Sequence, residues 1–533
     1  MKTVLCAVNS AYIHKNLAVL KLSKYIGDKV KVREFNVNSP RDFIYNELLT
    51  EKAEVYCFST YIWNIECIKA ISERLKKATG AAIVFGGPEA GGDAEGLIQS
   101  FPYIDYVIKG EGELALEHLI AVLEKGEKPT LPGIYDKTGG SGIAPVLKDV
   151  PFSYDEADIS VNAGKIFYYE SSRGCFNKCA YCVSGKEDVC LYDEEKVKAE
   201  LSHMASFNLP LIKLVDRSFN AYGKRSERML RFLSEETGDT CFHLEVAPDL
   251  FNEEMLDIIK NAKKGKFQFE AGIQSLNEET LSAIGRICNN EKALSNLKKI
   301  ISYGNVNVHT DIIAGLPVED MESFIKTFNG VYALKAKRMD VGFLKVLKGT
   351  VMEEIAENYG IVYESVPPYE VVKTDAMTAF DLSEIKKAHR ALDRIYNSGA
   401  FKNTVSSLEK NYNSFFEMYK TLGGIIEEGM SLSKVFSVLL YNFPHLKKPL
   451  IMDFMLSGEK KVPFGFDNIY IDKFSEKCIS FLSENCECYF PYLSHLHPGA
   501  AFKKLKFYAF KEGIFVSDRE KSLVYDITDK INC

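Results

Sequence analysis

Short apolar runs alternate with amphipathic stretches through the first 140 or so residues of the chain. The runs predict strands at positions 3–8, 30–35, 55–59, 82–85 and 106–108, and the intervals between them show helical spacing. Buried strands that alternate with helices are typical of a parallel sheet covered on both faces. We therefore predict a Rossmann-like α/β domain over residues 1–140.

A second alternating region begins after a Gly- and Pro-containing segment, which we interpret as a linker over residues 141–164. Strands are predicted at 167–170, 212–215, 243–246, 268–273, 307–313 and 340–346, with helices at 194–206, 226–235, 252–261 and 291–303. Six βα units over residues 165–370 favour a partial, open-sided TIM-like barrel. Residues 371–533 show a mainly helical pattern and predict a C-terminal domain, to which we assign no chemistry.

Composition adds limits to this picture. The chain has 533 residues, 46% hydrophobic and 26% charged, which is typical of a globular protein with several domains. Its net charge of -7 disfavours broad nucleic-acid binding. No apolar run reaches the roughly 20 residues of a membrane helix, and the start lacks a convincing signal-cleavage site. We expect a cytoplasmic protein without a membrane partner.

Polar and Gly-rich segments follow four of the strands predicted in the first domain. Because carboxyl ends of parallel strands share one edge, these segments should meet where doubly wound folds bind ligands. Each one alone is as easily an ordinary turn, but together they favour a site. The candidate residues are Asn9, Tyr12, Ser59, Thr60, Gly86, Gly87, Glu89, Gly110 and Glu111.

Three of the 13 cysteines have the spacing of metal ligands. Cys175, Cys179 and Cys182 form a C-x3-C-x2-C array just after a predicted strand. Soft thiolates suit iron–sulfur clusters or zinc. A structural zinc site would want a fourth ligand such as Cys190. Three ligands on a cubane leave one iron open for chemistry.

With Tyr181 before the last cysteine, this array resembles the signature of the radical S-adenosylmethionine (SAM) superfamily. The resemblance implies a 4Fe-4S cluster on the three cysteines, with SAM chelated at the open iron and cleaved by one electron to a 5'-deoxyadenosyl radical. Segments 214–220, 243–249, 269–277 and 309–317 resemble the later barrel strands of that family. Together with Tyr181 and with Arg286, which follows the third segment where relatives often place an arginine, they nominate SAM-binding residues. Each polar residue that ends a strand could otherwise merely satisfy loop backbone. The segments nominate Asp216, Glu245, Gln274, Ser275 and Asp311.

An α/β domain before such a barrel resembles the cobalamin-binding domain of cobalamin-dependent radical SAM proteins, and the resemblance covers about residues 1–370. It implies that the nine loop residues above line a cobalamin site. The Asp-x-His-x-x-Gly motif that supplies a histidine ligand in some cobalamin proteins is absent, and His14 lacks its neighbours. We therefore expect a corrinoid without a histidine ligand.

The preferred function is a radical SAM enzyme that uses cobalamin to methylate an unactivated carbon, with a reducing partner such as flavodoxin or ferredoxin. The leading alternative is a radical rearrangement or cyclisation in the same fold without methyl transfer. A non-catalytic iron–sulfur binding or sensing protein is the third interpretation. The substrate is not readable from the sequence.

Overall fold

The computed structural model describes residues 1–162, 164–459, 461–466, 468–469, 475–510 and 513–531. The chain divides into two compact units, one of residues 1–337 and 341–382 and the other of residues 338–340 and 383–533. Within the described ranges, no helix is both long enough and apolar enough to cross a membrane.

The first unit begins with the predicted Rossmann-like sheet. Its strands are β1 (Thr3–Asn9), β2 (Val30–Asn36), β3 (Val55–Ser59), β4 (Ala82–Gly86), β5 (Tyr106–Ile108) and β6 (Ile134–Tyr135). They lie in the order β2-β1-β3-β4-β5-β6, and only β6 runs antiparallel to its neighbour. The chain order therefore reverses between β1 and β3, the point at which such sheets bind ligands.

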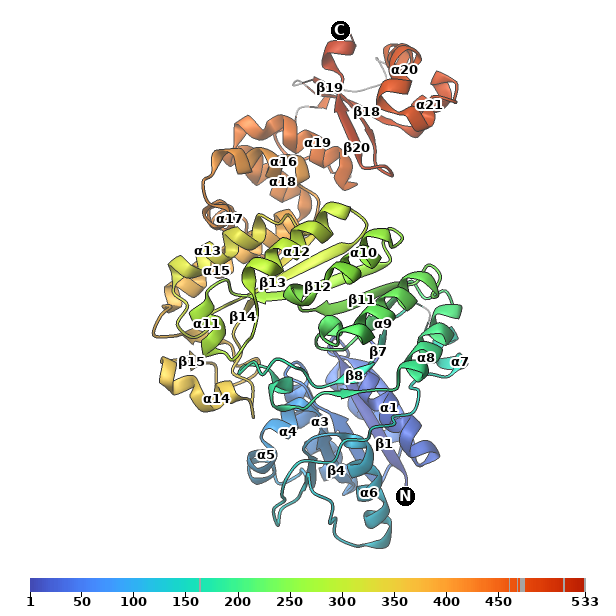
Figure 1. The fold of residues 1–533 in the computed structure, drawn as a ribbon, viewed down its shortest axis with the longest axis vertical. Coiled ribbons are helices and arrows are strands. Elements are labelled where there is room, and N and C mark those ends of the chain that lie inside the picture. Colours follow the sequence, from blue (N-terminus) through green and yellow to red (C-terminus); the bar gives the residue numbers. More distant parts are fainter. Residues whose placement is uncertain (163, 460, 467, 470–474, 511–512, 532–533) are drawn as a thin grey trace. The chain divides into compact units, whose positions relative to one another are not determined.

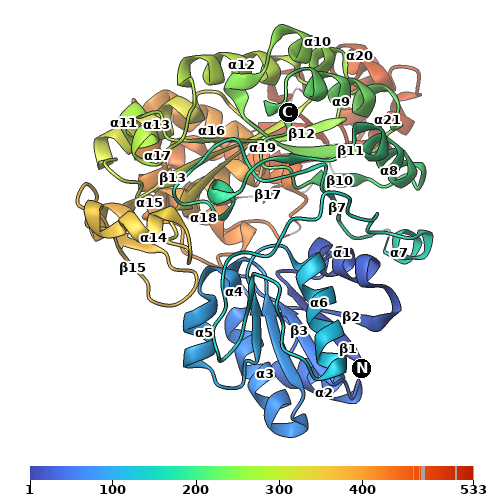
Figure 2. The same ribbon diagram turned by 60° about the horizontal axis from the view of Figure 1, so that its bottom comes forward.

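Both faces of this sheet are buried, as the apolar strand runs predict. One core joins alternate strand residues to α2 (Arg41–Thr50), α3 (Ile65–Thr79) and α5 (Ala94–Ser100). The other joins the remaining strand residues to α1 (Leu17–Ile26) and α6 (Gly112–Lys125), and Figure 2 shows these helices around the sheet. Two separate cores thus fix the loops at the strand ends.

The second sheet of this unit is the open barrel. Its strands β7 (Phe167–Tyr169), β10 (Leu211–Leu214), β11 (Cys241–Val246), β12 (Phe267–Gln274), β13 (Asn307–Ala314) and β14 (Arg338–Phe343) stand side by side in chain order. Along β12, buried and half-buried residues alternate strictly. The two faces of each strand therefore differ, and the half-buried set faces the interior of the barrel.

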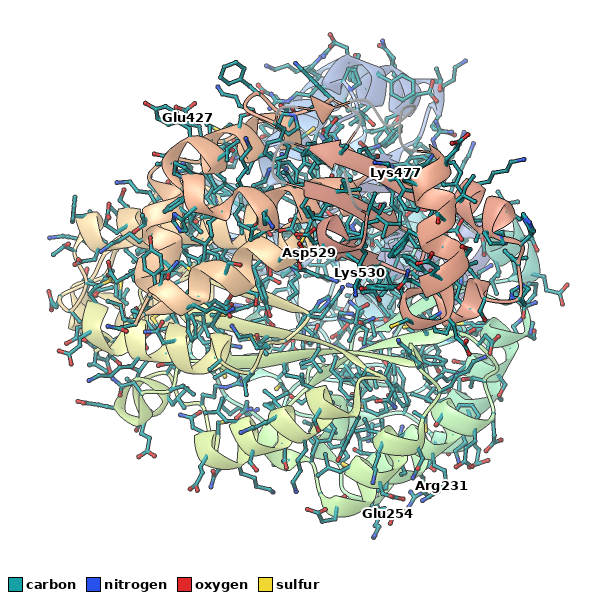
Figure 3. The ribbon with its side chains drawn as sticks, turned by 90° about the horizontal axis from the view of Figure 1, so that it is seen from above. Arg231, Glu254, Glu427, Lys477, Asp529 and Lys530 are labelled. Atoms are coloured by element: carbon teal, nitrogen blue, oxygen red, sulfur yellow. The ribbon has the colours of Figure 1, made fainter. Side chains whose placement is uncertain are left out.

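Helices cover the outside of this sheet. They are α8 (Glu194–Ser206), α9 (Lys224–Glu235), α10 (Glu253–Asn261), α11 (Glu278–Ala283), α12 (Asn290–Tyr303) and α13 (Met321–Tyr332). The ion pair between Arg231 of α9 and Glu254 of α10 lies on the outer surface of this layer (Figure 3). The six strands expected from the sequence are present in one sheet, and these helices follow the first five of them along the chain.

Between the two sheets, the segment we interpreted as a linker contains the short helix α7 (Glu156–Val161), which Asp155 caps. A small hairpin of β8 (Ser172–Arg173) and β9 (Cys190–Leu191) follows the first barrel strand. The chain from β14 continues through α14 (Val351–Ile355) to the strand pair β15 (Val362–Tyr363) and β16 (Val371–Lys373).

The second unit is largely helical, as predicted. Its helices include α16 (Lys402–Leu408), α17 (Phe415–Gly423), α18 (Leu432–Asn442), α19 (Lys447–Ser457), α20 (Ser475–Tyr489) and α21 (Pro498–Lys504). It also contains an antiparallel sheet that the sequence did not lead us to expect, made of β17 (Asn468–Ile469), β18 (Lys506–Phe510), β19 (Gly513–Asp518) and β20 (Leu523–Asp526).

Candidate functional site

The three ligand-spaced cysteines lie in one closed loop. The antiparallel pairing of Arg173 with Cys190 brings the two ends of the loop together. Gly174 has a φ of 76°, and a Cβ there would strike the backbone of Asp188. The tight start of the loop therefore requires glycine. Cys175 and Cys179 are buried, and none of the three cysteines forms a disulfide.

Backbone hydrogen bonds from distant segments hold the loop in place. Ala180 donates its amide to the carbonyl of Ile284, which follows α11, over 2.8 Å. The carbonyl of Ala180 accepts from the amide of Met352 in α14, also over 2.8 Å. A Cβ on Gly185 would lie 2.5 Å from the carbonyl oxygen of Cys179, so the loop packs closely on itself. The loop thus depends on segments far along the chain.

The three thiols share one environment. Burial raises the pKa of Cys182, and the nearby Cys179 and Cys175 add to the rise. Among the described residues, no three His, Cys, Asp or Glu side chains converge as ligands of a single metal ion would. A cubane binds each thiolate at a different iron, so its ligands need not converge on one point. The donor set and loop fit such a cluster.

Arg286 joins the cysteine loop to the barrel. Its Nη1 lies 3.8 Å from Sγ of Cys179, and its Nη2 donates to the carbonyl of Gly272 over 2.5 Å. Its Nε is buried without a hydrogen-bond partner. Because a buried guanidinium N–H rarely stays unpaired, Arg286 has donor capacity left for an anionic ligand beside the cluster.

Other nominated residues line the barrel interior near this point. Gln274 ends β12 with a φ of 69°, at a shift in register against β13. Asp311 is the β13 residue paired with Gly272. Glu245 of β11 has no hydrogen-bond or ion-pair partner among the described residues, and burial raises its pKa to about 7. Tyr181 lies beside Cys179 and Arg286, whose charges act on its hydroxyl.

Two nominated residues are already fully engaged. Asp216 is buried and accepts from the amide of Ser171 at 3.0 Å and from the hydroxyls of Ser171 and Ser172 at 2.6 and 2.5 Å. The hydroxyl of Ser275 donates to the buried carboxyl of Glu319 at 2.5 Å. Asp216 therefore fixes the chain that leads into the cysteine loop, and Ser275 fixes the turn after β12.

A cavity of about 650 Å³ opens between the carboxyl edge of the Rossmann-like sheet and the cysteine loop. Ser59, Gly86, Gly87, Gly110 and Glu111, five of the nine loop residues singled out in the sequence, line it. On the barrel side the lining includes residues directly after the last cysteine, at positions 183–184. The cavity thus borders both the strand-end loops of the first domain and the cysteine loop.

Four other nominated residues lie outside this lining. Thr60 is buried and its hydroxyl donates to the carbonyl of Gly86. Glu89 is buried and accepts a hydrogen bond from Tyr369. Asn9 donates to the carbonyl of His14, while Tyr12 is 71% exposed. These side chains support loops or face solvent rather than the cavity.

His14 does not line the cavity either. Its Nδ1 lies 2.5 Å from the hydroxyl oxygen of Tyr168, and the centroids of the two rings are 6.0 Å apart. No histidine is among the described residues that line the cavity. A corrinoid held there would not find a histidine ligand in this lining.

An aromatic stack forms part of the cavity wall. Tyr61 lines the cavity, and its ring stacks on Trp63 with centroids 4.3 Å apart and planes 6° from parallel. Trp63 also donates its indole N–H to the carbonyl of Val8. It is the only tryptophan in the chain.

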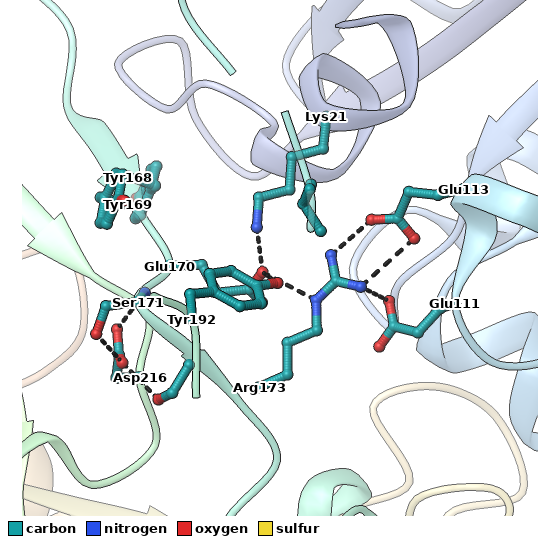
Figure 4. A network of polar contacts seen from close by, with 12 residues as sticks. Lys21, Glu111, Glu113, Tyr168, Tyr169, Glu170, Ser171, Arg173, Tyr192 and Asp216 are labelled. Atoms are coloured by element: carbon teal, nitrogen blue, oxygen red, sulfur yellow. Dashed lines mark hydrogen bonds and ion pairs between the residues drawn. The ribbon is translucent and has the colours of Figure 1, made fainter. Parts of the chain in front are cut away.

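An ion network centred on Arg173 connects the two sheets at the cavity (Figure 4). Arg173 contacts Glu113 at 2.6 Å and Glu111 at 2.8 Å, both from the start of α6, and Glu170 at 2.9 Å. Lys21 of α1 pairs with the same Glu170. Burial works against the charged form of Glu170, but Lys21 and Arg173 hold its pKa below the ordinary value.

Our sequence analysis missed two arginines of this site, Arg173 and Arg217. Arg217 lines the cavity and follows Asp216 directly. Because neighbouring residues of an extended segment point in opposite directions, the burial of Asp216 implies an open position for Arg217. That alternation was the signal available in the sequence.

Three protein families match successive segments of this chain. The B12 binding domain matches residues 3–120, the Radical SAM superfamily matches residues 169–330, and the family described as "Protein of unknown function (DUF4080)" matches residues 357–525. The chain belongs to the radical SAM superfamily, with a B12-binding domain before the barrel and a DUF4080 domain after it. These domains imply a 4Fe-4S cluster and SAM, and suggest cobalamin.

Among curated proteins, the chain is similar to the cobalamin-dependent radical SAM methyltransferase TokK of Streptomyces tokunonensis. The two are 23% identical over 300 residues, which cover 51% of this chain and 44% of TokK. The chain thus spans about half the length of the curated relative it matches.

Among solved structures, the cobalamin-dependent SAM radical enzyme OxsB, bound to aqua-cobalamin and SAM, superposes with a TM-score of 0.63 at 15% identity. The match covers 94% of this chain and 83% of OxsB. The methyltransferase TsrM from Kitasatospora setae, with cobalamin and a 4Fe-4S cluster bound, gives a TM-score of 0.57 at 17% identity and covers 68% and 76% of the two chains. Both likenesses show a shared fold.

Proposed function

We propose that this protein is a cobalamin-dependent radical SAM methyltransferase that acts on an unactivated carbon. The observation that carries the proposal is the cavity of about 650 Å³, which is lined at once by the carboxyl edge of the B12-binding domain and by the cysteine loop. A methyl donor on one side and a radical source on the other would both reach a substrate placed between them. The names of TokK and TsrM support methyl transfer over rearrangement.

When bound, the cluster and SAM would supply a 5'-deoxyadenosyl radical, and the corrinoid would supply the methyl group. The protein's own part is to hold and orient them. Cys175, Cys179 and Cys182 would bind three irons, and Arg286 would bind the carboxylate of SAM through its free donor capacity. Glu245, Gln274, Asp311 and Tyr181 would surround the rest of SAM.

On the other side of the cavity, small residues let backbone approach a large ring. Gly87 has a φ of 100°, and a Cβ there would lie 2.6 Å from the carbonyl oxygen of Thr60. Gly86 and Gly110 line the same wall. The lining without histidine fits a base-off corrinoid. A one-electron donor such as flavodoxin or ferredoxin completes the proposed system.

The first half of the reaction can be tested without knowing the substrate. Protein reconstituted anaerobically with iron, sulfide and hydroxocobalamin is given SAM and a strong reductant. Methyl transfer to the corrinoid should release S-adenosylhomocysteine, and reductive cleavage should release 5'-deoxyadenosine. Deoxyadenosine without S-adenosylhomocysteine would favour the rearrangement alternative. A cluster that cleaves no SAM at all would favour the sensing alternative.

A further inference from the structure

Two arginines from the barrel lie beside the cysteine loop, Arg286 and Arg217. Arg286 lies beside Cys179 and outside the lining of the cavity. Arg217 follows β10, and its charge acts on Cys182 and Cys175. Only Arg217 also lines the cavity between the cysteine loop and the B12-binding domain. The guanidinium of Arg286 therefore lies beside Cys179, whereas that of Arg217 borders the cavity.

The guanidinium of Arg217 has donors to spare. Its one hydrogen bond among the described residues runs from Nε to the hydroxyl of Ser184, at 3.3 Å. Glu245 and Glu187 are the carboxylates that act most strongly on its charge, yet neither forms an ion pair with it in the described part of the chain. The side chain is exposed, and the space it is exposed to is the cavity. Its two terminal amino groups are thus free.

The position of Arg217 has a chemical consequence that rests on the proposed function. The reacting carbon must come within reach of a radical made beside the cysteine loop and of a methyl group held over the B12-binding domain. A side chain that borders both also borders the substrate. Since Arg286 already provides a cation for the carboxylate of SAM, Arg217 is available for another anion.

We propose that Arg217 is a substrate-binding residue and that the substrate carries an oxyanion, a carboxylate or a phosphate, near the carbon that is methylated. Two free amino groups in one plane match two oxygens of such a group, which is the bidentate geometry that arginine favours. The hydrogen bond to Ser184, two residues after Cys182, fixes the orientation of the guanidinium relative to the cluster.

Chemical modification of arginine tests this directly. Protein with its cluster is treated with phenylglyoxal in separate samples that contain or lack SAM, hydroxocobalamin, or inorganic phosphate or acetate as the probe. Modified arginines are then located by peptide mass spectrometry. We expect phosphate or acetate to slow modification of Arg217 severalfold. Arg286 should be protected by SAM and not by these anions. Arg231 on the outer surface should react under every condition.

Separate arms distinguish the sources of an oxyanion. Protection of Arg217 by SAM alone, together with weaker SAM binding in Arg217→Gln, would assign Arg217 to SAM and overturn the proposal. Protection by hydroxocobalamin alone would assign it to the corrinoid and overturn it as well. No protection by either probe with both cofactors bound would also overturn it. Arg217→Lys, which keeps the charge, controls for misfolding.

The same samples report separately on the proposed function. Corrinoid retention and S-adenosylhomocysteine release are measured on each preparation before modification. If both are present but phosphate and acetate leave Arg217 unprotected, only the substrate inference fails. If corrinoid or S-adenosylhomocysteine is absent, the methyltransferase proposal fails first.

Discussion

Glu113, the second residue of α6, forms an ion pair with Arg173 at 2.6 Å, and Arg173 stands two residues before Cys175, the first cysteine of the loop. The Glu113 side chain is 4% exposed and the Arg173 side chain 10%. The B12-binding domain and the cysteine loop are therefore connected through a buried charge pair, and this contact sets one edge of the cavity.

Replacing Arg173 by Met should lower the free energy of unfolding by about 3–5 kcal/mol, because Glu111, Glu113 and Glu170 lose the cation they share. Burial, with the neighbouring carboxylates, raises the pKa of Glu111 to about 7 even with Arg173 present, and Arg173 opposes this rise. In the variant Glu111 and Glu170 are protonated more readily, because Arg173 no longer opposes the effect of burial on their pKa values. The deficit should be larger at pH 8, where they are charged, than at pH 6.

Urea unfolding followed by the fluorescence of Trp63 measures this effect in the B12-binding domain. Arg231→Met, which breaks a surface pair, is the control and should change stability by less than about 0.5 kcal/mol. An equal loss in both variants would show that the buried network contributes no more than a surface one.

Cluster assembly should depend on three cysteines only. Ala at position 175, 179 or 182 removes one of three thiolates and should abolish cluster binding and SAM cleavage. Cys190→Ala is the matched control, since Cys190 lies at the other end of the same loop, on β9. Iron and sulfide content with the visible spectrum measures the outcome. Loss of metal in Cys190→Ala, with zinc in the native protein, would favour a zinc site.

Arg286→Gln should weaken SAM binding roughly ten- to hundredfold while the cluster still assembles, because a charge-assisted hydrogen bond contributes about 1.5–3 kcal/mol. Equilibrium binding of SAM to the reconstituted protein measures this, and the iron content checks the cluster. An unchanged dissociation constant would show that the free Nε of Arg286 is satisfied by something other than SAM.

Ser275→Ala should lower stability and leave SAM binding intact. The Ser275 hydroxyl is buried, donates to Glu319 and accepts from the amide of Asn277. Leaving these groups unpaired costs about 1–3 kcal/mol. Thermal unfolding and SAM titration on one sample separate the two effects. A lower SAM affinity with an unchanged melting temperature would instead show that Ser275 contacts SAM.

Corrinoid binding should quench the emission of Trp63, since the stacked Tyr61 lines the cavity and the corrin ring absorbs light in the region of indole emission. The quenching is measured during titration with hydroxocobalamin. The Trp63→Phe variant gives the background fluorescence that does not come from indole. Quenching that persists when Tyr61→Ala has weakened corrinoid retention would place the corrinoid elsewhere.

The fold was largely predictable because buried parallel strands are short and apolar and stand between amphipathic helices. The site was predictable only in part. Strand ends locate an edge, but they do not say where a side chain points: Ser59 lines the cavity, whereas Thr60 beside it turns inward and donates to Gly86. Arg217 escaped notice for the same reason, next to the buried Asp216. The C-terminal sheet escaped notice because β18, β19 and β20, although no shorter than β5 or β10, come at the end of a region whose pattern we interpreted as mainly helical.

The hydrogen bonds that hold Ala180 in the cysteine loop can form only late in synthesis of the chain. Its partner Met352 leaves the ribosome about 170 residues after it. At bacterial-like synthesis speeds of about 5–20 residues per second, this is a delay on the order of 10 to 30 seconds. During that interval the three thiols are already made while the segment that closes their loop is not. Oxygen and stray metals therefore compete for them before the barrel is complete.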